Sequence, residues 1–194
     1  MQKCGLPAKR NKLYHLRGYG FYFCQLDSCA TIFLMETNTE AAFKWIVGIL
    51  QNNNIPFQIS GGFAAKLYGS DRVLFDIDID IEGKNFKKIL PFVKTHILSG
   101  PALYYSQSFD VELLTLEYQG QRIDLSSSED SKIYDPDKKQ WQECSTDYNI
   151  FTEHEVYGLK VPVITLRDLI EYKRIIRRPT DLEDIDAISK NLPK

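Results

Sequence analysis

Three aspartates alternate with apolar residues in one short segment, which reads Phe75-Asp76-Ile77-Asp78-Ile79-Asp80-Ile81. Side chains of a β-strand point to opposite faces in turn, so the aspartates should share one face and the apolar residues the other. Carboxylates two positions apart lie about 6–7 Å apart at their Cα atoms, and their oxygens can converge on one or two divalent cations. Aspartate is a poor strand former and like charges repel, so the pattern favours a Mg²⁺ site over the alternative of a solvated acidic face.

A glycine turn precedes this segment. Ser60-Gly61-Gly62 lies between a strand predicted at residues 56–60 and a helix predicted at residues 63–68. Glycines allow the backbone to approach a phosphate closely, and the start of a helix offers free N–H groups. The alternative interpretation is a tight turn without a ligand.

Other ion and phosphate motifs do not fit the chain. Counted from Asp76, the sixth and twelfth positions of an EF-hand would be Ile81 and Lys87, where glycine and glutamate are needed. The glycine turn matches neither the GxxxxGK(S/T) spacing of a P-loop nor the GxGxxG of a dinucleotide-binding fold. The four cysteines contain no CxxC pair, so a structural zinc site is not indicated.

The glycine turn and the aspartate strand belong to a longer pattern with a third element downstream. In order, the pattern is Gly61-Gly62-x-Ala64, Gly69, Arg72, Asp76-x-Asp78 and, later, Gln121-Arg122-Ile123-Asp124-Leu125. This combination resembles the signature of the polymerase-β-like nucleotidyltransferase superfamily. It is most similar to small bacterial members such as AbiEii-type toxins and antibiotic nucleotidyltransferases, over roughly residues 55–125.

The resemblance implies a fold and an activity. The fold would be α/β (α+β), a mixed sheet flanked by helices with further helices at the C-terminus. The activity would be transfer of a nucleoside monophosphate from an NTP such as ATP to a hydroxyl of RNA, protein or a small molecule, with release of pyrophosphate. The alternatives are a catalytically silent nucleotide-binding module and a toxin–antitoxin interaction module with an antitoxin-type protein partner.

The resemblance also implies roles for individual residues. Asp76 and Asp78 would bind two Mg²⁺ ions, with Mn²⁺ as the alternative metal, and Asp124 would complete one site and help to deprotonate the acceptor. The residues Ser60, Gly61 and Gly62 would hold the triphosphate. Arg72 would either contact phosphate or brace the strand. Leu74 stands where many small members have threonine, which weakens the assignment to a subfamily but leaves the aspartates unaffected.

Lys173 is predicted near the centre of the apolar side of a helix over residues 166–177. A lysine is costly to bury without an anionic partner. Three alternatives follow: it extends to solvent along its own stem, it pairs with Asp181, or it reaches the phosphates of the NTP. The neighbouring Arg174, Arg177 and Arg178 complete a basic cluster that could hold triphosphate or RNA, or form a solvated helix face.

The chain divides into three predicted regions. Residues 1–34 show no sustained period and are predicted to be an extension, whereas Thr37 and Glu40 form a capping box that predicts a helix start. The nucleotidyltransferase core is then expected at residues 35–164 and a helical segment at residues 165–194. Within them, patterns predict a helix over residues 85–98, strands over 111–118 and 121–125, mostly loop over 126–150, and a last helix starting from a capping box at Thr180.

Composition sets few further limits. The net charge is −2 and the sequence pI about 5.9, so the overall charge of the chain does not indicate nucleic-acid binding. No apolar run approaches the length of a membrane helix, and the chain is expected to be cytoplasmic with reduced cysteines.

Overall fold

The computed structural model describes residues 21–24, 31–34 and 38–191 of the 194-residue chain. The chain divides into two compact units, Met1–Thr37 and Asn38–Lys194. In the first unit, β1 (Phe21–Cys24) pairs antiparallel with β2 (Thr31–Leu34). The second unit contains all the residues discussed below. Within the described part of the chain, no helix has the length and apolar character needed to cross a membrane.

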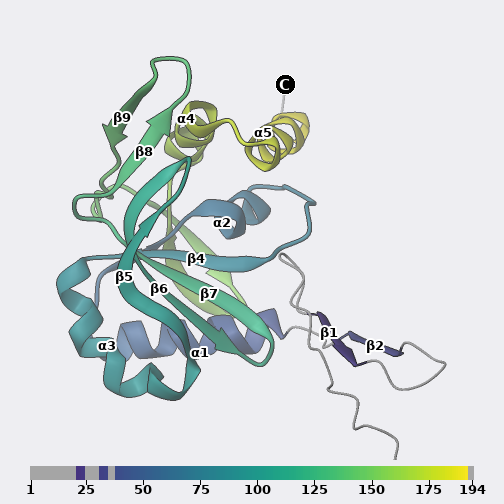
Figure 1. The fold of residues 1–194 in the computed structure, drawn as a ribbon, viewed down its shortest axis with the longest axis vertical. Helices are drawn as coiled ribbons and strands as arrows, with labels where there is room; N and C mark the ends of the chain where they lie inside the picture. Colours follow the sequence, from purple (N-terminus) through teal and green to yellow (C-terminus); the bar gives the residue numbers. More distant parts are fainter. Residues whose placement is uncertain (1–20, 25–30, 35–37, 192–194) are drawn as a thin grey trace, which may run out of the picture. The chain divides into compact units, whose positions relative to one another are not determined.

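The second unit is built on one mixed sheet (Figure 1). Its nine described strands are β3 (Phe57–Ile59), β4 (Asp76–Ile81), β5 (Ile97–Tyr105), β6 (Phe109–Tyr118), β7 (Gln121–Ser127), β8 (Lys132–Asp135), β9 (Gln140–Glu143), β10 (Thr152–Val156) and β11 (Leu159–Val163). The strand order is β10-β11-β3-β4-β7-β6-β8-β9, and β5 pairs with β6. The parallel neighbours β4 and β7 therefore occupy the middle of the sheet.

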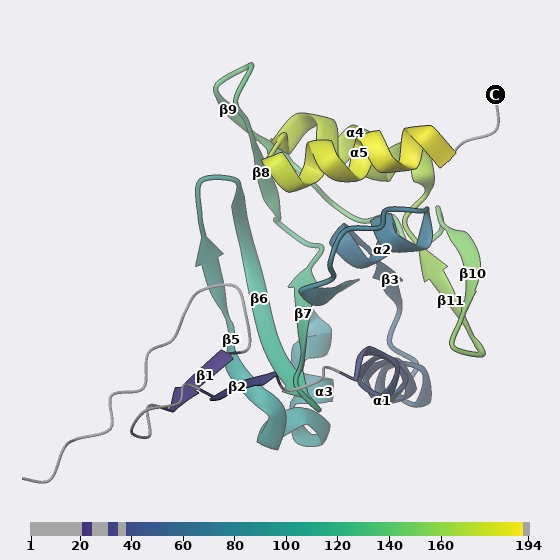
Figure 2. The ribbon, with the colours of Figure 1, turned by 90° about the vertical axis from the view of Figure 1, so that its right-hand side faces the viewer.

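Helices lie on both sides of the sheet. They are α1 (Thr39–Asn52), α2 (Gly61–Leu67), α3 (Phe86–Val93), α4 (Leu166–Ile176) and α5 (Pro179–Asn191), with short 3₁₀ turns at Gly83–Asn85 and Lys94–His96. Figures 1 and 2 both show α4 and α5 together at one end of the view, with α1 and α3 at the other. The mixed α/β fold with C-terminal helices that the sequence predicts is thus confirmed.

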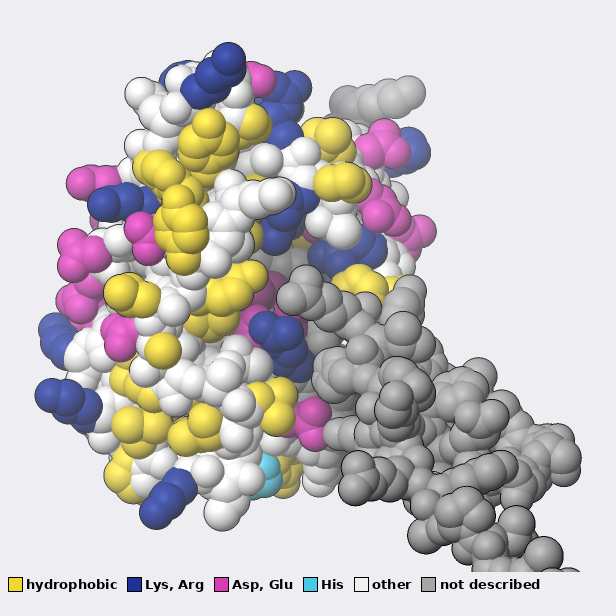
Figure 3. Space-filling model, viewed as in Figure 1, with side chains coloured by type: hydrophobic (Ala, Val, Ile, Leu, Met, Phe, Trp, Pro, Cys, Tyr) yellow, Lys and Arg dark blue, Asp and Glu magenta, His cyan; other side chains and the backbone are white. Residues whose placement is uncertain are grey.

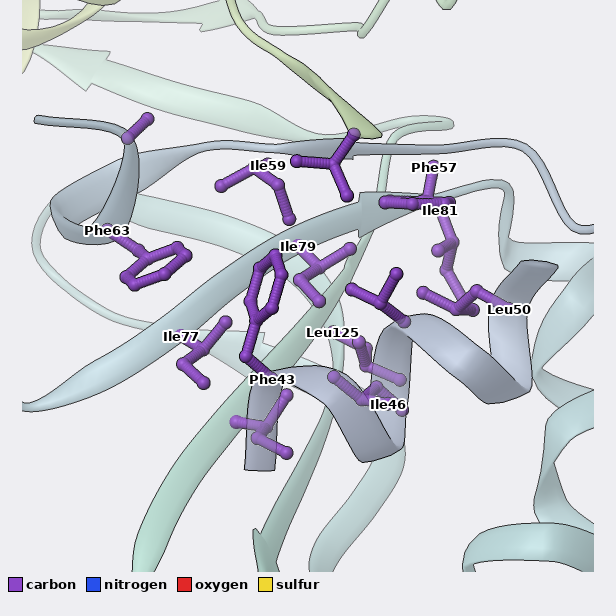
Figure 4. Close-up of a cluster of buried hydrophobic side chains, with 14 of the residues drawn as sticks. Phe43, Ile46, Leu50, Phe57, Ile59, Phe63, Ile77, Ile79, Ile81 and Leu125 are labelled. Carbon is purple, nitrogen blue, oxygen red and sulfur yellow. The ribbon is translucent and has the colours of Figure 1, made fainter. Parts of the chain in front are cut away.

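The alternation within β4 separates a core face from a polar face. Ile77, Ile79 and Ile81 are fully buried against the apolar side of α1, which presents Phe43 and Ile46 (Figure 4). Burial of aliphatic side chains on this scale is the main stabilising term for such a unit. Because strand side chains alternate, the same packing holds the aspartates of β4 on the opposite face, below α4.

Several element boundaries differ from the sequence prediction. Asn38, rather than Thr37, caps α1, and its side chain accepts the Ala41 N–H at 2.9 Å; Thr37 itself lies outside the described residues. The predicted capping box at Thr180 is wrong, because α5 begins one residue earlier at Pro179. Proline is favoured in the first helical turn, where its missing N–H is not needed.

The sequence also misplaced the strands around the middle of the chain. The helix predicted over residues 85–98 ends at Val93 as α3, and residues 97–105 form β5. Pro101 made a strand here unfavourable on sequence grounds, because proline cannot donate a backbone hydrogen bond within a sheet. It is tolerated because β5 pairs with only one neighbour. Within residues 126–150, where mostly loop was predicted, β8 and β9 form an antiparallel hairpin.

Candidate active site

Three aspartates from β4 and β7 meet on the polar face of the sheet. Asp78 is the direct neighbour of Asp124 in the parallel register of the two strands, and Asp76 precedes Asp78 on the same face. One carboxylate oxygen from each residue lies within 4.8 Å of the others. The structure therefore brings together the three residues that the sequence singled out as metal ligands.

The electrostatics of this cluster suit a bound cation. Burial raises the pKa of Asp76, and the neighbouring charge of Asp124 raises it further. Burial raises the pKa of Asp78 well above its ordinary value, with a further contribution from Asp76. Three carboxylates that repel one another in a desolvated site offer only oxygen ligands, which is the donor set that Mg²⁺ and Mn²⁺ prefer.

The glycine turn lies directly against Asp78. The backbone N–H of Gly62 donates to Asp78 Oδ2 at 2.7 Å. Gly61 has a φ of 57°, and a Cβ atom at this position would lie 2.1 Å from the same oxygen. Only glycine allows this approach, so the backbone of the turn lies in direct contact with the carboxylate of Asp78.

Asp80, the third aspartate of β4, is held by hydroxyl groups. Ser60 donates to it at 3.1 Å and Thr146 at 3.0 Å. Burial raises the pKa of Asp80 to about 6 even though both hydrogen bonds lower it. Asp80 therefore anchors the glycine turn to β4.

Lys173 lies in a buried network of charges between α4 and α5. Its side chain is 1% exposed, and its Nζ lies 3.1 Å from Asp181 and 2.9 Å from Asp184. This burial excludes extension to solvent, and pairing with Asp181 is what the structure shows. Arg72 joins the network through Nε and Nη2, which donate to Asp184 at 3.1 and 3.3 Å.

The two buried aspartates are compensated by these cations. Burial alone would raise the pKa of Asp181, but hydrogen bonds from Arg178 and Lys173 lower it below its ordinary value. Burial opposes ionisation of Asp184 in the same way, and Arg72, Lys173 and Ser70 outweigh it. Two carboxylates thus position three cations, Arg72, Lys173 and Arg178, at one edge of the candidate site.

Arg178 is a residue of the site that the sequence did not separate from its basic neighbours. Its Nε and Nη2 donate to Asp181 at 2.8 and 3.0 Å, and its guanidinium lies 4.8 Å from the centre of the Phe109 ring. By contrast, Arg177 pairs with Asp137, and Arg174 lines a separate cavity between α4 and the β8–β9 hairpin. The sequence shows that the cluster is basic. Which of its cations faces the aspartates of β4 and β7 depends on the short connection between α4 and α5.

Arg122 holds Asp124 from the same strand. Its Nε donates to Oδ1 at 3.0 Å and its Nη2 to Oδ2 at 2.7 Å, which is the bidentate geometry of a strong ion pair. Strand alternation could have revealed this contact, because the two residues are two positions apart on one face. In the structure described here Arg122 compensates the charge of the third aspartate.

A cavity of about 600 Å³ opens above the aspartates. Figure 3 shows acidic side chains within a hollow on this face of the molecule, next to basic and hydrophobic side chains. All eight predicted site residues line it: Ser60, Gly61, Gly62, Arg72, Asp76, Asp78, Asp124 and Lys173. The cavity size suits a nucleotide-sized or drug-sized ligand.

Solved structures with a similar fold include candidate nucleotidyltransferases and antibiotic adenylyltransferases. The chain is similar to a candidate nucleotidyltransferase from Thermotoga maritima, with a TM-score of 0.61 and 16% identity over 81% of this chain and 97% of that one. It is similar to the lincosamide antibiotic adenylyltransferase LnuA in its lincomycin-bound form, with a TM-score of 0.51 and 16% identity over 80% of this chain and 98% of that one. It is also similar to ANT(2″)-Ia in complex with adenylyl-2″-tobramycin, with a TM-score of 0.53 and 15% identity over 81% and 91% of the two chains.

These likenesses define the class of fold. The chain has the mixed α/β nucleotidyltransferase fold with C-terminal helices, and the fold that the sequence resemblance implied is confirmed. Neither a family model nor a curated protein sequence matches the chain. A shared fold leaves the substrates open, so the function must be argued from the site.

Proposed function

We propose that this protein is a metal-dependent nucleotidyltransferase that transfers a nucleoside monophosphate from an NTP to a hydroxyl acceptor. The observation that carries the proposal is the convergence of Asp76, Asp78 and Asp124 within 4.8 Å beside a glycine turn. Asp76 and Asp78 would hold two divalent ions, and Asp124 would complete one of the two sites. Bound there, Mg²⁺ or Mn²⁺ would neutralise charge on the transferred phosphoryl group and lower the pKa of the acceptor hydroxyl.

The nucleotide would lie between the glycine turn and α4. In this proposal the backbone of the turn receives the triphosphate, with Lys173 and Arg178 supplying positive charge from the opposite wall. Both cations are fixed in place by Asp181, so little reorganisation is needed when the phosphates arrive. The double contact of Arg72 with Asp184 favours bracing over direct phosphate binding for that residue.

The chemical step is an in-line displacement at the α-phosphorus. The acceptor oxygen forms a bond to this phosphorus as the bond to the pyrophosphate oxygen breaks, and pyrophosphate leaves along the glycine turn. The proton of the acceptor hydroxyl passes to Asp124. Arg122 must loosen its hold on Asp124 for that carboxylate to serve as a ligand and base.

The proposal is tested by replacing one metal ligand. Asp78→Asn should reduce transfer from each α-labelled NTP into a total cell extract to background, because the neutral amide binds Mg²⁺ poorly. The fold should survive, since the new amide oxygen can still accept the N–H of Gly62. The matched control is Asp186→Asn on the exposed side of α5, where the carboxylate is 66% exposed.

The outcomes separate the two candidate functions. Transfer by the wild-type protein and the control, with loss in Asp78→Asn, supports the enzyme, and the chemical class of the labelled product identifies the acceptor. Full transfer by Asp78→Asn would contradict the proposal. NTP binding by the wild-type protein without transfer to any component of the extract would favour the silent nucleotide-binding module.

A further inference from the structure

The side of the cavity that receives the acceptor follows from in-line geometry. If the triphosphate lies at the glycine turn, the attacking hydroxyl must approach the α-phosphorus from the opposite side. Across the sheet, the turn follows β3, and the order continues through β4 and β7 to β6 and β5. The acceptor should therefore lie over β6 and β5, beyond Asp124.

The surface at that position is apolar. It consists of side chains that line the cavity from β5, β6 and β8, here called the acceptor wall: Tyr104, Phe109, Val111, Leu113 and Ile133. The register of the strands places these residues on the face of the sheet that holds the aspartates, since Leu113 pairs with Ser126 and Val111 pairs with Tyr104. In Figure 3 hydrophobic side chains gather beside the hollow.

Charges near the acceptor wall are few. Of the three acidic residues of β6, Asp110 and Glu112 alternate with the wall residues, and Glu117 shares the face of the wall residues but lies further along the strand beside Arg122; none of the three is among those lining the cavity. Lys132 lines the cavity beside the wall residue Ile133. The guanidinium of Arg178, which lies over the Phe109 ring, is already paired with Asp181. A polycationic acceptor would need acidic groups here, and a polynucleotide would need a track of unpaired cations, so neither matches this wall.

We infer that the acceptor is a small uncharged molecule with an aromatic or aliphatic ring and a free hydroxyl group. This inference rests on the proposed function. The ring packs on Val111 and Leu113 with Tyr104 at its edge, which places the hydroxyl near Asp124. Ser126 also lines the cavity, and its hydroxyl offers a hydrogen bond to a further polar group of such a molecule.

Three probes of different charge test this class of acceptor. They are 4-nitrophenyl β-D-glucoside as an uncharged ring with hydroxyls, tobramycin as a polycation, and a short single-stranded RNA as a polyanion. Binding is measured by calorimetry on the full chain with Mg²⁺ and a non-hydrolysable NTP analogue. The glucoside should bind at least about tenfold more tightly than either charged probe, equivalent to about 1.4 kcal/mol.

Variants on the two faces of the β5–β6 hairpin test whether the glucoside binds at the acceptor wall. Leu113→Glu places a charge in the acceptor wall and should weaken glucoside binding by about tenfold or more. Leu103→Glu is the matched control, because Leu103 is 82% exposed and its register partner Glu112 is on the opposite face. Tyr104→Ala, at a side chain 46% exposed, should weaken binding without a risk to folding.

Each result decides a different point. Tighter binding of tobramycin or RNA, no measurable binding of the glucoside, or equal glucoside affinity in Leu113→Glu and Leu103→Glu would overturn the acceptor class. In these cases Mg²⁺-dependent NTP binding would remain, and the transfer of label from α-labelled NTP would still decide the proposed function. If the wild-type protein binds no NTP with Mg²⁺, the proposed function fails and the acceptor class fails with it.

Discussion

At the scale of single residues, the site depends on one close approach between backbone and carboxylate. Asp78 accepts the N–H of Gly62, and the α-carbon of Gly61 lies against the same side chain. A larger residue would push the turn away from β4. The proposed phosphate site can therefore lie close to the proposed metal ligands only because position 61 is glycine.

Gly61→Ala should weaken Mg²⁺-dependent NTP binding by about tenfold or more and lower the melting temperature. The φ of 57° costs alanine about 1–2 kcal/mol, and its Cβ would clash with Asp78 Oδ2. The matched control is Gly48→Ala in α1, where nothing lies within 4 Å of the new methyl group. That substitution should stabilise the protein by about 0.5–1 kcal/mol and leave NTP binding unchanged. Wild-type binding in Gly61→Ala would show that the close approach is unimportant.

The sequence revealed some residues of the site and concealed others for a physical reason. Asp76 and Asp78 could be predicted because strand alternation is a local rule that fixes which side chains share a face. Asp124 could be placed beside them only through the family resemblance, since strand pairing is not local. Arg178 and Asp184 depend on how α5 folds back along α4, and no local pattern specifies that arrangement.

At the scale of elements, buried charges connect α4 and α5 to the segment that precedes β4. Lys173 of α4 pairs with Asp181 and Asp184 of α5, and Asp184 also accepts hydrogen bonds from Arg72 and from the Ser70 hydroxyl at 2.7 Å. Two members of this network, Arg72 and Lys173, line the cavity above the aspartates. The C-terminal helices thus contribute to the shape of the cavity as well as to the fold.

Lys173→Met should destabilise the protein by about 3–5 kcal/mol, because it leaves two buried carboxylates with less compensation. Chemical denaturation followed by tryptophan fluorescence measures the change. The matched control is Lys190→Met, which removes an exposed i,i+4 pair with Asp186 and should cost no more than about 1 kcal/mol. Equal effects of the two substitutions would mean that the buried network contributes no more than a surface ion pair.

Elements were predictable where their pattern was local. The β6–β7 hairpin followed from the two alternating runs over residues 111–118 and 121–125, and α4 begins at Leu166, where the helix over residues 166–177 was predicted to start. The strand β5 was missed because Gly100 and Pro101 interrupt its middle, and its pairing with β6 shifts register there. The hairpin β8–β9 was missed because its strands are only four residues long and polar.

At the scale of the whole molecule, the start of α1 is held by contacts within the second unit. The backbone N–H of Asn38 donates to the carbonyl of Gln119 at 3.2 Å, and the Thr39 hydroxyl donates to the Gln121 side chain at 2.7 Å. Asn38 also caps the helix with its own side chain. These contacts, all made by residues from position 38 onward, supply partners that the first turn of a helix needs.

A variant that lacks residues 1–34 should therefore fold, melt within about 2 °C of the full chain and bind NTP with Mg²⁺ as tightly. A variant that lacks residues 1–50 is the control, since it removes the fully buried Phe43, Ile46 and Leu50 from the core. Each such loss costs about 2–5 kcal/mol, and together they approach or exceed the total stability of about 5–15 kcal/mol expected for a domain. The control should be unfolded by circular dichroism. If the shorter deletion also unfolds or loses NTP binding, the segment before Met35 is a working part of the nucleotidyltransferase unit, and the predicted extension is wrong.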